Sequence, residues 1–138
     1  MDLSQEDRVK YKSLFVQTAQ EYVTALQKNL SLFVTDASNK EAINGIFVAA
    51  HSLTSQSLLM GYTQTGNFVS LIEKIFRAKK DNASYEIGSA LVELIQKGVE
   101  KIDASITEIE KDDKEADVSE EIRELESLSG FKSGREQT

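Results

Sequence analysis

The feature that most constrains the fold of this chain is the complete absence of proline from its 138 residues. Average usage of about 5% would give a chain of this length about seven prolines. Proline lacks a backbone N–H and clashes with the preceding turn, so it is excluded from helix interiors but is common in turns and edge strands. We therefore expect a mostly helical chain, long enough to form one self-sufficient domain.

Apolar residues recur at steps of three and four along four stretches, which cover about residues 3–33, 38–61, 63–80 and 84–109. This spacing places an apolar stripe on one face of a helix. A shorter stretch at residues 117–128 follows the same pattern, and no segment has the alternation and flanking turns of a strand pair. The connections are short, so neighbouring helices should be antiparallel. The predicted fold is all-α: an antiparallel up-down four-helix bundle with a short fifth C-terminal helix.

The predicted helix starts rest on side chains that can cap the first turn. Ser38 followed three residues later by Glu41 has the spacing of a capping box and is expected to open the second helix. Side chains that can cap the later helices are Thr63 or Thr65 for the third, Ser84 for the fourth, and Asp117 or Ser119 for the fifth.

The charge of the chain is concentrated in one segment. Residues 107–126 hold 10 acidic and 3 basic residues, so this segment alone carries the formal net charge of −7. We interpret it as a solvated helix end and linker, which divides the chain into a bundle at residues 1–112 and an acidic linker, short helix and polar tail at 113–138. The acidic balance argues against a nucleic-acid partner, and no apolar run is long enough for membrane insertion. We predict a cytoplasmic protein.

The composition leaves one residue to carry chemistry. Cysteine is absent and histidine occurs once, which excludes disulfides, thiolate metal sites and multi-histidine zinc sites, and no glycine-rich phosphate loop is present. We expect no metal site and no bound cofactor. His51 is predicted to lie at the edge of the apolar face of the second helix, beside small residues that leave the imidazole open. A lone histidine in such a place is ordinarily a boundary residue without a function.

The residues around His51 form a more specific pattern. Residues 46–53 read IFVAAHSL, and Gly61 and Tyr62 follow His51 at a defined distance. This segment resembles the histidine phosphotransfer (HPt) domain of CheA-type chemotaxis histidine kinases, whose pattern reads approximately I-F-R-A-A-H-[ST]-[LI]-K-G, with a Gly and an aromatic residue farther on. The resemblance covers roughly residues 10–112. It implies a four-helix bundle with His51 as the phospho-acceptor.

Two residues beside His51 depart from the family pattern. Thr54 stands where the family has Lys, and Ser55 stands where it has Gly. The family lysine would pair with phosphoryl oxygens, whereas Thr54 offers at most one neutral hydrogen bond. Ser55 narrows the space that a glycine leaves, although its hydroxyl can donate to phosphate. The resemblance assigns Thr54 and Ser55 to the phosphoryl environment.

Glu73 aligns with the family glutamate that accepts a hydrogen bond from the second imidazole nitrogen. Such a partner would orient the ring, keep the proton on Nδ1 and leave Nε2 as the nucleophile. The alternative is a solvated helix glutamate paired with Lys74 or Arg77. Ser70, one turn earlier, occupies a position where some family members carry a second histidine.

The resemblance implies a phosphoryl carrier in chemotaxis-type two-component signalling, a module of a histidine kinase without an ATP-binding site of its own. A histidine kinase catalytic domain, which binds ATP and Mg²⁺, would phosphorylate His51, and an Asp of a response-regulator receiver domain would take the phosphoryl group. Docking contacts are expected at Val48, Ser52, Ser55 and Tyr62, and at residues of the third helix near Glu73. Two alternatives remain open: a degenerate HPt-like bundle that only binds partners, and an unrelated helical adaptor.

Overall fold

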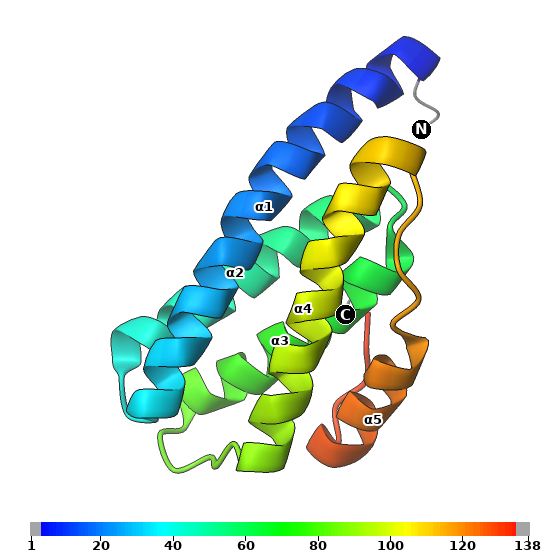
Figure 1. Ribbon diagram of the computed structural model, residues 1–138. Coiled ribbons are helices and arrows are strands. Elements are labelled where there is room, and N and C mark those ends of the chain that lie inside the picture. The colour runs from blue at the N-terminus through cyan, green and yellow to red at the C-terminus, as the bar shows by residue number, and fades with distance from the viewer. Residues whose placement is uncertain (1–3, 135–138) are drawn as a thin grey trace.

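The computed structural model describes residues 4–134, which form five α-helices and no strand (Figure 1). The all-α prediction and the short fifth helix are confirmed. None of the described helices is long and apolar enough to cross a membrane. The helices are α1 (Gln5–Thr35), α2 (Lys40–Leu59), α3 (Thr63–Asp81), α4 (Ser89–Asp112) and α5 (Ser119–Ser129).

The helices pack as a connected set of neighbours. The long helix α1 contacts both α2 and α4, α2 contacts α3 along its length, and α5 lies against α3 and α4. Figure 1 shows α1 beside α4, with α5 at the side of the bundle near the end where α4 begins. This arrangement leaves α2 and α3 paired along one side of the molecule, where the candidate site lies.

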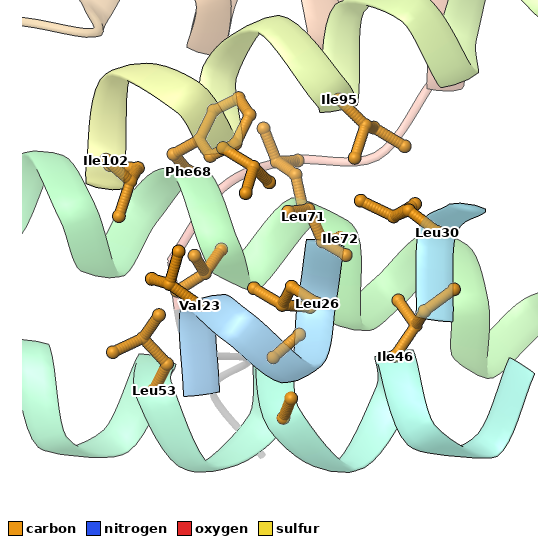
Figure 2. Packing of buried hydrophobic residues seen from close by; sticks show 14 of the residues in the cluster. Val23, Leu26, Leu30, Ile46, Leu53, Phe68, Leu71, Ile72, Ile95 and Ile102 are labelled. Atoms are coloured by element: carbon orange, nitrogen blue, oxygen red, sulfur yellow. The ribbon is translucent and has the colours of Figure 1, made fainter. Parts of the chain in front are cut away.

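The core is built from the apolar stripes that the spacing predicted. The side chains that meet inside the bundle come from all four long helices and are at most 1% exposed (Figure 2). Burying each such side chain stabilises the fold by roughly 1.5–3 kcal/mol. The labelled members of this core are Val23, Leu26, Leu30, Ile46, Leu53, Phe68, Leu71, Ile72, Ile95 and Ile102.

A tight turn joins α2 to α3. Gly61 has a φ of +85°, in the left-handed region that side chains other than glycine rarely adopt. The Gly61 N–H donates to the Leu58 carbonyl (3.1 Å) and the Tyr62 N–H donates to the Ser57 carbonyl (2.9 Å), which is the Schellman arrangement for ending a helix. Because only residues 60–62 separate the two helices, α2 and α3 lie side by side from the start.

The predicted caps of the second and fourth helices are wrong. Asn39, not Ser38, caps α2, because its side chain accepts from the Ala42 N–H at 3.0 Å while the Ser38 hydroxyl donates to Asp36. Helix α4 begins at Ser89 with Gly88 as its N-cap, four residues after the predicted cap at Ser84. Ser84 instead closes a turn within the loop, donating both its N–H and its hydroxyl to Asn82.

The cap of α3 comes from a distant part of the chain. Neither Thr63 nor Thr65 caps this helix with its own side chain. The carboxylate of Glu115, in the α4–α5 connection, accepts from the Gln64 N–H (3.1 Å), the Thr65 N–H (3.0 Å) and the Thr65 hydroxyl (2.9 Å). The helix start is therefore satisfied by tertiary structure, which a search for local caps cannot find.

Helix α5 is joined to the bundle by apolar packing. Val118, Ile122 and Leu125 are buried in the same cluster as the core of α1–α4. After α5, residues 130–134, called here the C-terminal segment, run back along α3. The division of the chain at residue 112 stays a prediction, but the described part of the C-terminal region packs against the bundle.

Candidate functional site

His51 projects from α2 with 58% of its side chain exposed. One turn earlier, the Phe47 ring stacks on the imidazole with an interplanar angle of 23° and ring centroids 6.1 Å apart. Ser52 and Ser55, the neighbouring polar residues, are small. The imidazole is thus supported on one face and accessible to another molecule.

Glu73 of α3 lies opposite His51 and contacts its ring. The Nδ1 atom of His51 is 2.8 Å from Oε2 of Glu73, whose side chain is 13% exposed. A carboxylate can only accept, so Nδ1 carries the proton in this contact, and in the neutral imidazole Nε2 then keeps its lone pair. The pair joins residues 22 positions apart, which the turn at residues 60–62 brings together.

Arg77 contacts the same oxygen of Glu73. Its Nη2 atom lies 3.0 Å from Oε2, in an i,i+4 pair along α3. The Arg77 guanidinium carbon also lies 5.4 Å from the centre of the Phe47 ring, where the cation meets the negative face of the ring. The Glu73 carboxylate therefore contacts a histidine of α2 and an arginine of α3 together. It pairs with Arg77, as the alternative interpretation expected, but with 13% of its side chain exposed it is largely buried and not solvated.

These residues surround one pocket of about 230 Å³. Two basic side chains and one carboxylate face the histidine across it. Its lining consists of His51, Thr54, Ser55, Glu73, Lys74, Arg77 and Gly134. The structure thus brings together all four residues that the sequence proposed for the site, and adds Lys74, Arg77 and Gly134 to them.

Thr54 and Ser55 differ in what they offer the pocket. Thr54 is only 3% exposed, and its hydroxyl donates to the Ala50 carbonyl at 2.7 Å. The hydroxyl hydrogen of Thr54 is therefore already bonded within α2. Ser55 is half-buried, with its hydroxyl at the pocket wall. Neither residue brings a positive charge to the site.

The basic residues in the second half of α3 make different contacts. Lys79 donates to the carbonyls of Ala83 (2.8 Å) and Tyr85 (2.9 Å) and so secures the loop after the helix. Lys80 lies over the Phe47 ring, 4.8 Å from its centre. Lys74, by contrast, lines the pocket, and its ammonium donates to the backbone carbonyl of Lys132.

Gly134 lines the pocket, although no pattern in the sequence predicted it as a site residue. Its N–H donates to the Ser70 hydroxyl at 2.8 Å, and that hydroxyl donates to the Asn67 carbonyl at 2.7 Å. A small residue near the end of a polar tail carries no pattern that would place it beside His51. The spacing of Lys74 and Arg77 around Glu73 was visible in the sequence, but not that both line the pocket.

Tyr62 was predicted to contact a docking partner, and the structure places it elsewhere. The residue is 4% exposed and its hydroxyl donates to Asp113 at 2.5 Å. Burial and the neighbouring Asp113 carboxylate raise the pKa of the Tyr62 phenol. Tyr62 therefore connects the α2–α3 turn to the end of α4. Val48, another predicted docking residue, lies on the face of α2 near His51 and is 48% exposed.

Among residues 4–134, no group of three or more acidic, histidine or cysteine side chains is placed to hold a metal ion. What the site does contain is an exposed imidazole on a helix, in contact with a carboxylate from the next helix and facing a pocket with two cations. These features define a helical protein that presents one exposed histidine beside a carboxylate and two cations.

Comparison with known proteins gives the same class. The Hpt domain family model matches residues 10–128, and the chain belongs to this family, which confirms the resemblance drawn from the sequence. The match continues past residue 112 and takes in most of α5.

Several curated relatives carry the name chemotaxis protein CheA. The relative from Bacillus subtilis (strain 168) is 25% identical over 121 residues, which is 87% of this chain and 18% of that protein. Those from Listeria monocytogenes and Borreliella burgdorferi are 26% and 28% identical over 83% and 74% of this chain, and 19% and 11% of their own lengths. The chain thus spans less than a fifth of these relatives. No solved structure matches it.

Proposed function

We propose that this chain is the histidine phosphotransfer domain of a chemotaxis-type two-component system, with His51 as the phospho-acceptor. The observation that carries the proposal is the 2.8 Å contact between His51 Nδ1 and Glu73 Oε2. In the neutral imidazole this contact makes Nε2 the nitrogen without a proton, on a ring that is more than half exposed. The proposal also takes α1–α4 as an antiparallel up-down bundle, which the short connections and the packing of neighbouring helices support.

The chemistry requires little of the domain itself. Nε2 of His51 attacks the γ-phosphorus of ATP, a P–N bond forms and the P–O bond to ADP breaks. Because Nδ1 keeps its proton, positive charge develops on the ring, and the Glu73 carboxylate stabilises it. In the second step, a receiver Asp oxygen attacks the phosphorus and the P–N bond breaks. Nε2 then regains its lone pair and the original tautomer returns.

Partner proteins would supply the other groups that phosphoryl transfer needs. A histidine kinase catalytic domain would bind ATP and Mg²⁺, which neutralise most of the phosphate charge during the transfer. Because the phosphoryl donor is ATP, the domain would act in the cytoplasm. Thr54 and Ser55 would form part of the phosphoryl environment, with the Ser55 hydroxyl as the available donor.

Phosphorylation by a kinase domain tests the proposal directly. The chain is incubated with Mg²⁺, labelled ATP and the ATP-binding domain of a CheA relative, such as the one from Bacillus subtilis. We expect label that is labile in acid and stable in base, as a P–N bond requires. His51→Gln should remove the label, whereas Ser52→Ala, at the adjacent position, should keep it.

Absence of label from an active kinase domain, with the native fold intact, would favour the alternative function. In that case the chain is a degenerate HPt-like bundle that only binds partners. The specific observation behind this alternative is the absence of a cation at Thr54, because its hydroxyl hydrogen is already bonded to Ala50.

A further inference from the structure

The arrangement around His51 raises a charge problem that the contacts so far do not solve. A phosphoryl group on Nε2 carries up to two negative charges and sits near the Glu73 carboxylate. The family lysine that would offset this charge is replaced by Thr54, whose hydroxyl hydrogen is held by the Ala50 carbonyl at 2.7 Å. Like charges about 4 Å apart repel by about 1 kcal/mol in water.

Two cations on α3 face the same pocket from the opposite side. Arg77 uses Nη2 for Glu73, and a guanidinium has further N–H donors in a fork that matches phosphate oxygens. Contact with the Phe47 ring holds the guanidinium in place. Lys74 precedes Arg77 by three residues, so the two side chains lie on one face of α3. Both are among the residues that line the pocket with His51.

The C-terminal segment holds Lys74 at this position. The Lys74 ammonium donates to the Lys132 carbonyl and has two further N–H donors. Two more bonds hold the segment itself: the Ser133 N–H donates to Glu126 at 2.8 Å, and the Gly134 N–H donates to Ser70 at 2.8 Å. The side chain of Lys74 is therefore held between α3 and a fixed backbone rather than left free in solvent.

We propose that Lys74 and Arg77 bind the phosphoryl group on His51 and take the place of the missing lysine at position 54, with the C-terminal segment positioning Lys74. This inference rests on the proposed function of His51. It assigns the phosphoryl-binding cations to α3 instead of α2, and makes the C-terminal segment a part of the site.

A chemical phosphodonor tests the pair without any kinase. Potassium phosphoramidate transfers its phosphoryl group to an imidazole nitrogen and releases ammonia, and ³¹P NMR then follows the titration of the phosphoryl group on His51. In the variant Lys74→Gln with Arg77→Gln we expect the second phosphoryl pKa to rise by about half a unit to one unit, because nearby cations favour the dianion. Lys28→Gln, an exposed lysine of α1 outside the pocket, is the matched control.

The kinase reaction separates this inference from the proposed function. We expect the double variant to be labelled by the kinase domain roughly tenfold more slowly than wild type, for the same electrostatic reason. Suppose that wild type, the double variant and Lys28→Gln are labelled at equal rates and that their phosphoryl groups have the same pKa. The cation pair is then wrong, while the function of His51 stands. If the kinase labels none of them but the phosphoramidate product shows the pKa shift, the function is wrong and the pair stands.

A lysine restored at position 54 provides a rescue test. Thr54 lines the pocket, so the longer side chain can extend its ammonium into it while its stem stays against the helix. In the Lys74, Arg77 double variant, Thr54→Lys should recover most of the lost rate and return the phosphoryl pKa towards the wild-type value. Thr54→Met has similar length without the charge and should recover neither. Equal recovery by both substitutions would overturn the electrostatic explanation.

The positioning role of the C-terminal segment has its own readout. Ser70→Ala removes the acceptor of the Gly134 N–H with little change in volume. The single variant Lys74→Gln should also raise the phosphoryl pKa, and Ser70→Ala should reproduce part of that rise. The two changes combined should raise the pKa no more than Lys74→Gln alone, because both act through the same ammonium. Additive shifts would show that the segment does not act through Lys74.

Discussion

At the scale of single residues, one carboxylate oxygen organises the site. Oε2 of Glu73 lies 2.8 Å from His51 Nδ1 and 3.0 Å from Arg77 Nη2, so a helix-to-helix contact and a contact within α3 converge on one atom. Glu73 is the least exposed of the three side chains and is positioned by the packing of α2 on α3. Its loss would release both the imidazole and the guanidinium.

Replacement of Glu73 should therefore slow phosphorylation without unfolding the protein. A hydrogen bond to a charged group contributes roughly 1.5–3 kcal/mol, so Glu73→Ala should label about tenfold to a hundredfold more slowly. Glu73→Gln, which can still accept from Nδ1 but carries no charge, should fall between Ala and wild type. Initial rates of labelling by the kinase domain check this, with Glu93→Ala on the exposed face of α4 as the control. A wild-type rate in Glu73→Ala would remove its orienting role.

At the scale of helices, the acidic segment is mostly exposed, as its composition predicted, but it also attaches helices to one another. Several of its carboxylates make specific contacts with other helices. Asp113 accepts from the Tyr62 hydroxyl, Glu115 caps α3, and Glu121 pairs with Lys101 of α4. These three carboxylates therefore help to fix α3 and α5 to the rest of the molecule.

The cap that Glu115 provides for α3 should be measurable in stability. Replacing a capping side chain by Ala typically costs about 1 kcal/mol, and up to about 2 kcal/mol, because backbone N–H groups lose their acceptor. We expect a loss of this size for Glu115→Ala in urea unfolding. Glu108→Ala, an exposed residue near the end of α4, should change the free energy of unfolding by less than about 0.5 kcal/mol. Equal effects at the two positions would contradict the cap.

The attachment of α5 and the C-terminal segment should depend on pH. The Ser133 N–H lowers the pKa of Glu126, and at Glu121 burial opposes ionisation, but the hydrogen bond from Lys101 prevails and lowers the pKa. A carboxyl whose pKa is lower in the folded state stabilises the fold above the unfolded value of about 4.3 and loses this contribution as the pH falls through the folded pKa.

We therefore expect α5 and residues 130–134 to detach as the pH falls below about 4, before the core of the bundle opens. NMR spectra recorded between pH 6 and pH 3 check this, because amides of α5 should shift or broaden at higher pH than amides of α2. In Glu126→Gln the C-terminal segment should be loosened already at pH 6, with a weaker pH dependence. A single simultaneous transition of all helices would be inconsistent with this scheme.

At the scale of the whole molecule, one core holds both the four long helices and α5. Helix α3, which carries Glu73, Lys74 and Arg77, is packed by α2 on one side and contacted by α4 and α5 on others. Gly98 of α4 permits a close approach to α3, because a Cβ at this position would overlap the Phe68 ring. The site residues of α3 therefore rest on a helix that the rest of the molecule holds firmly.

A methyl group at position 98 should disturb this packing. Gly98→Ala gains about 1 kcal/mol of helix propensity but forces an overpacked contact that typically costs about 1–3 kcal/mol. We expect a net loss of up to about 2 kcal/mol in the free energy of unfolding, relieved by adding Phe68→Leu. Gly88→Ser, in open space at the start of α4, serves as the control and should be neutral or slightly stabilising. A stabilised Gly98→Ala would contradict the close approach.

Local pattern alone was enough to predict the helices and the buried stripes, and the composition left His51 as the single candidate to carry chemistry. Residues such as Leu26 and Ile72 bury themselves because of their spacing along a single helix, and that spacing is written in the sequence. The family resemblance added Glu73, whose distance from Nδ1 the structure then supplied.

The helix starts and the full composition of the site were decided only in three dimensions. Glu115 caps α3 from 50 residues away, and Gly134 reaches the Ser70 hydroxyl across 64 positions. Such contacts depend on how the helices pack, since a polar group takes whichever partner the packing brings within reach. A serine or threonine just before a helix is therefore only a candidate cap, and a lysine such as Lys74 joins the site because the chain returns along α3 to hold it.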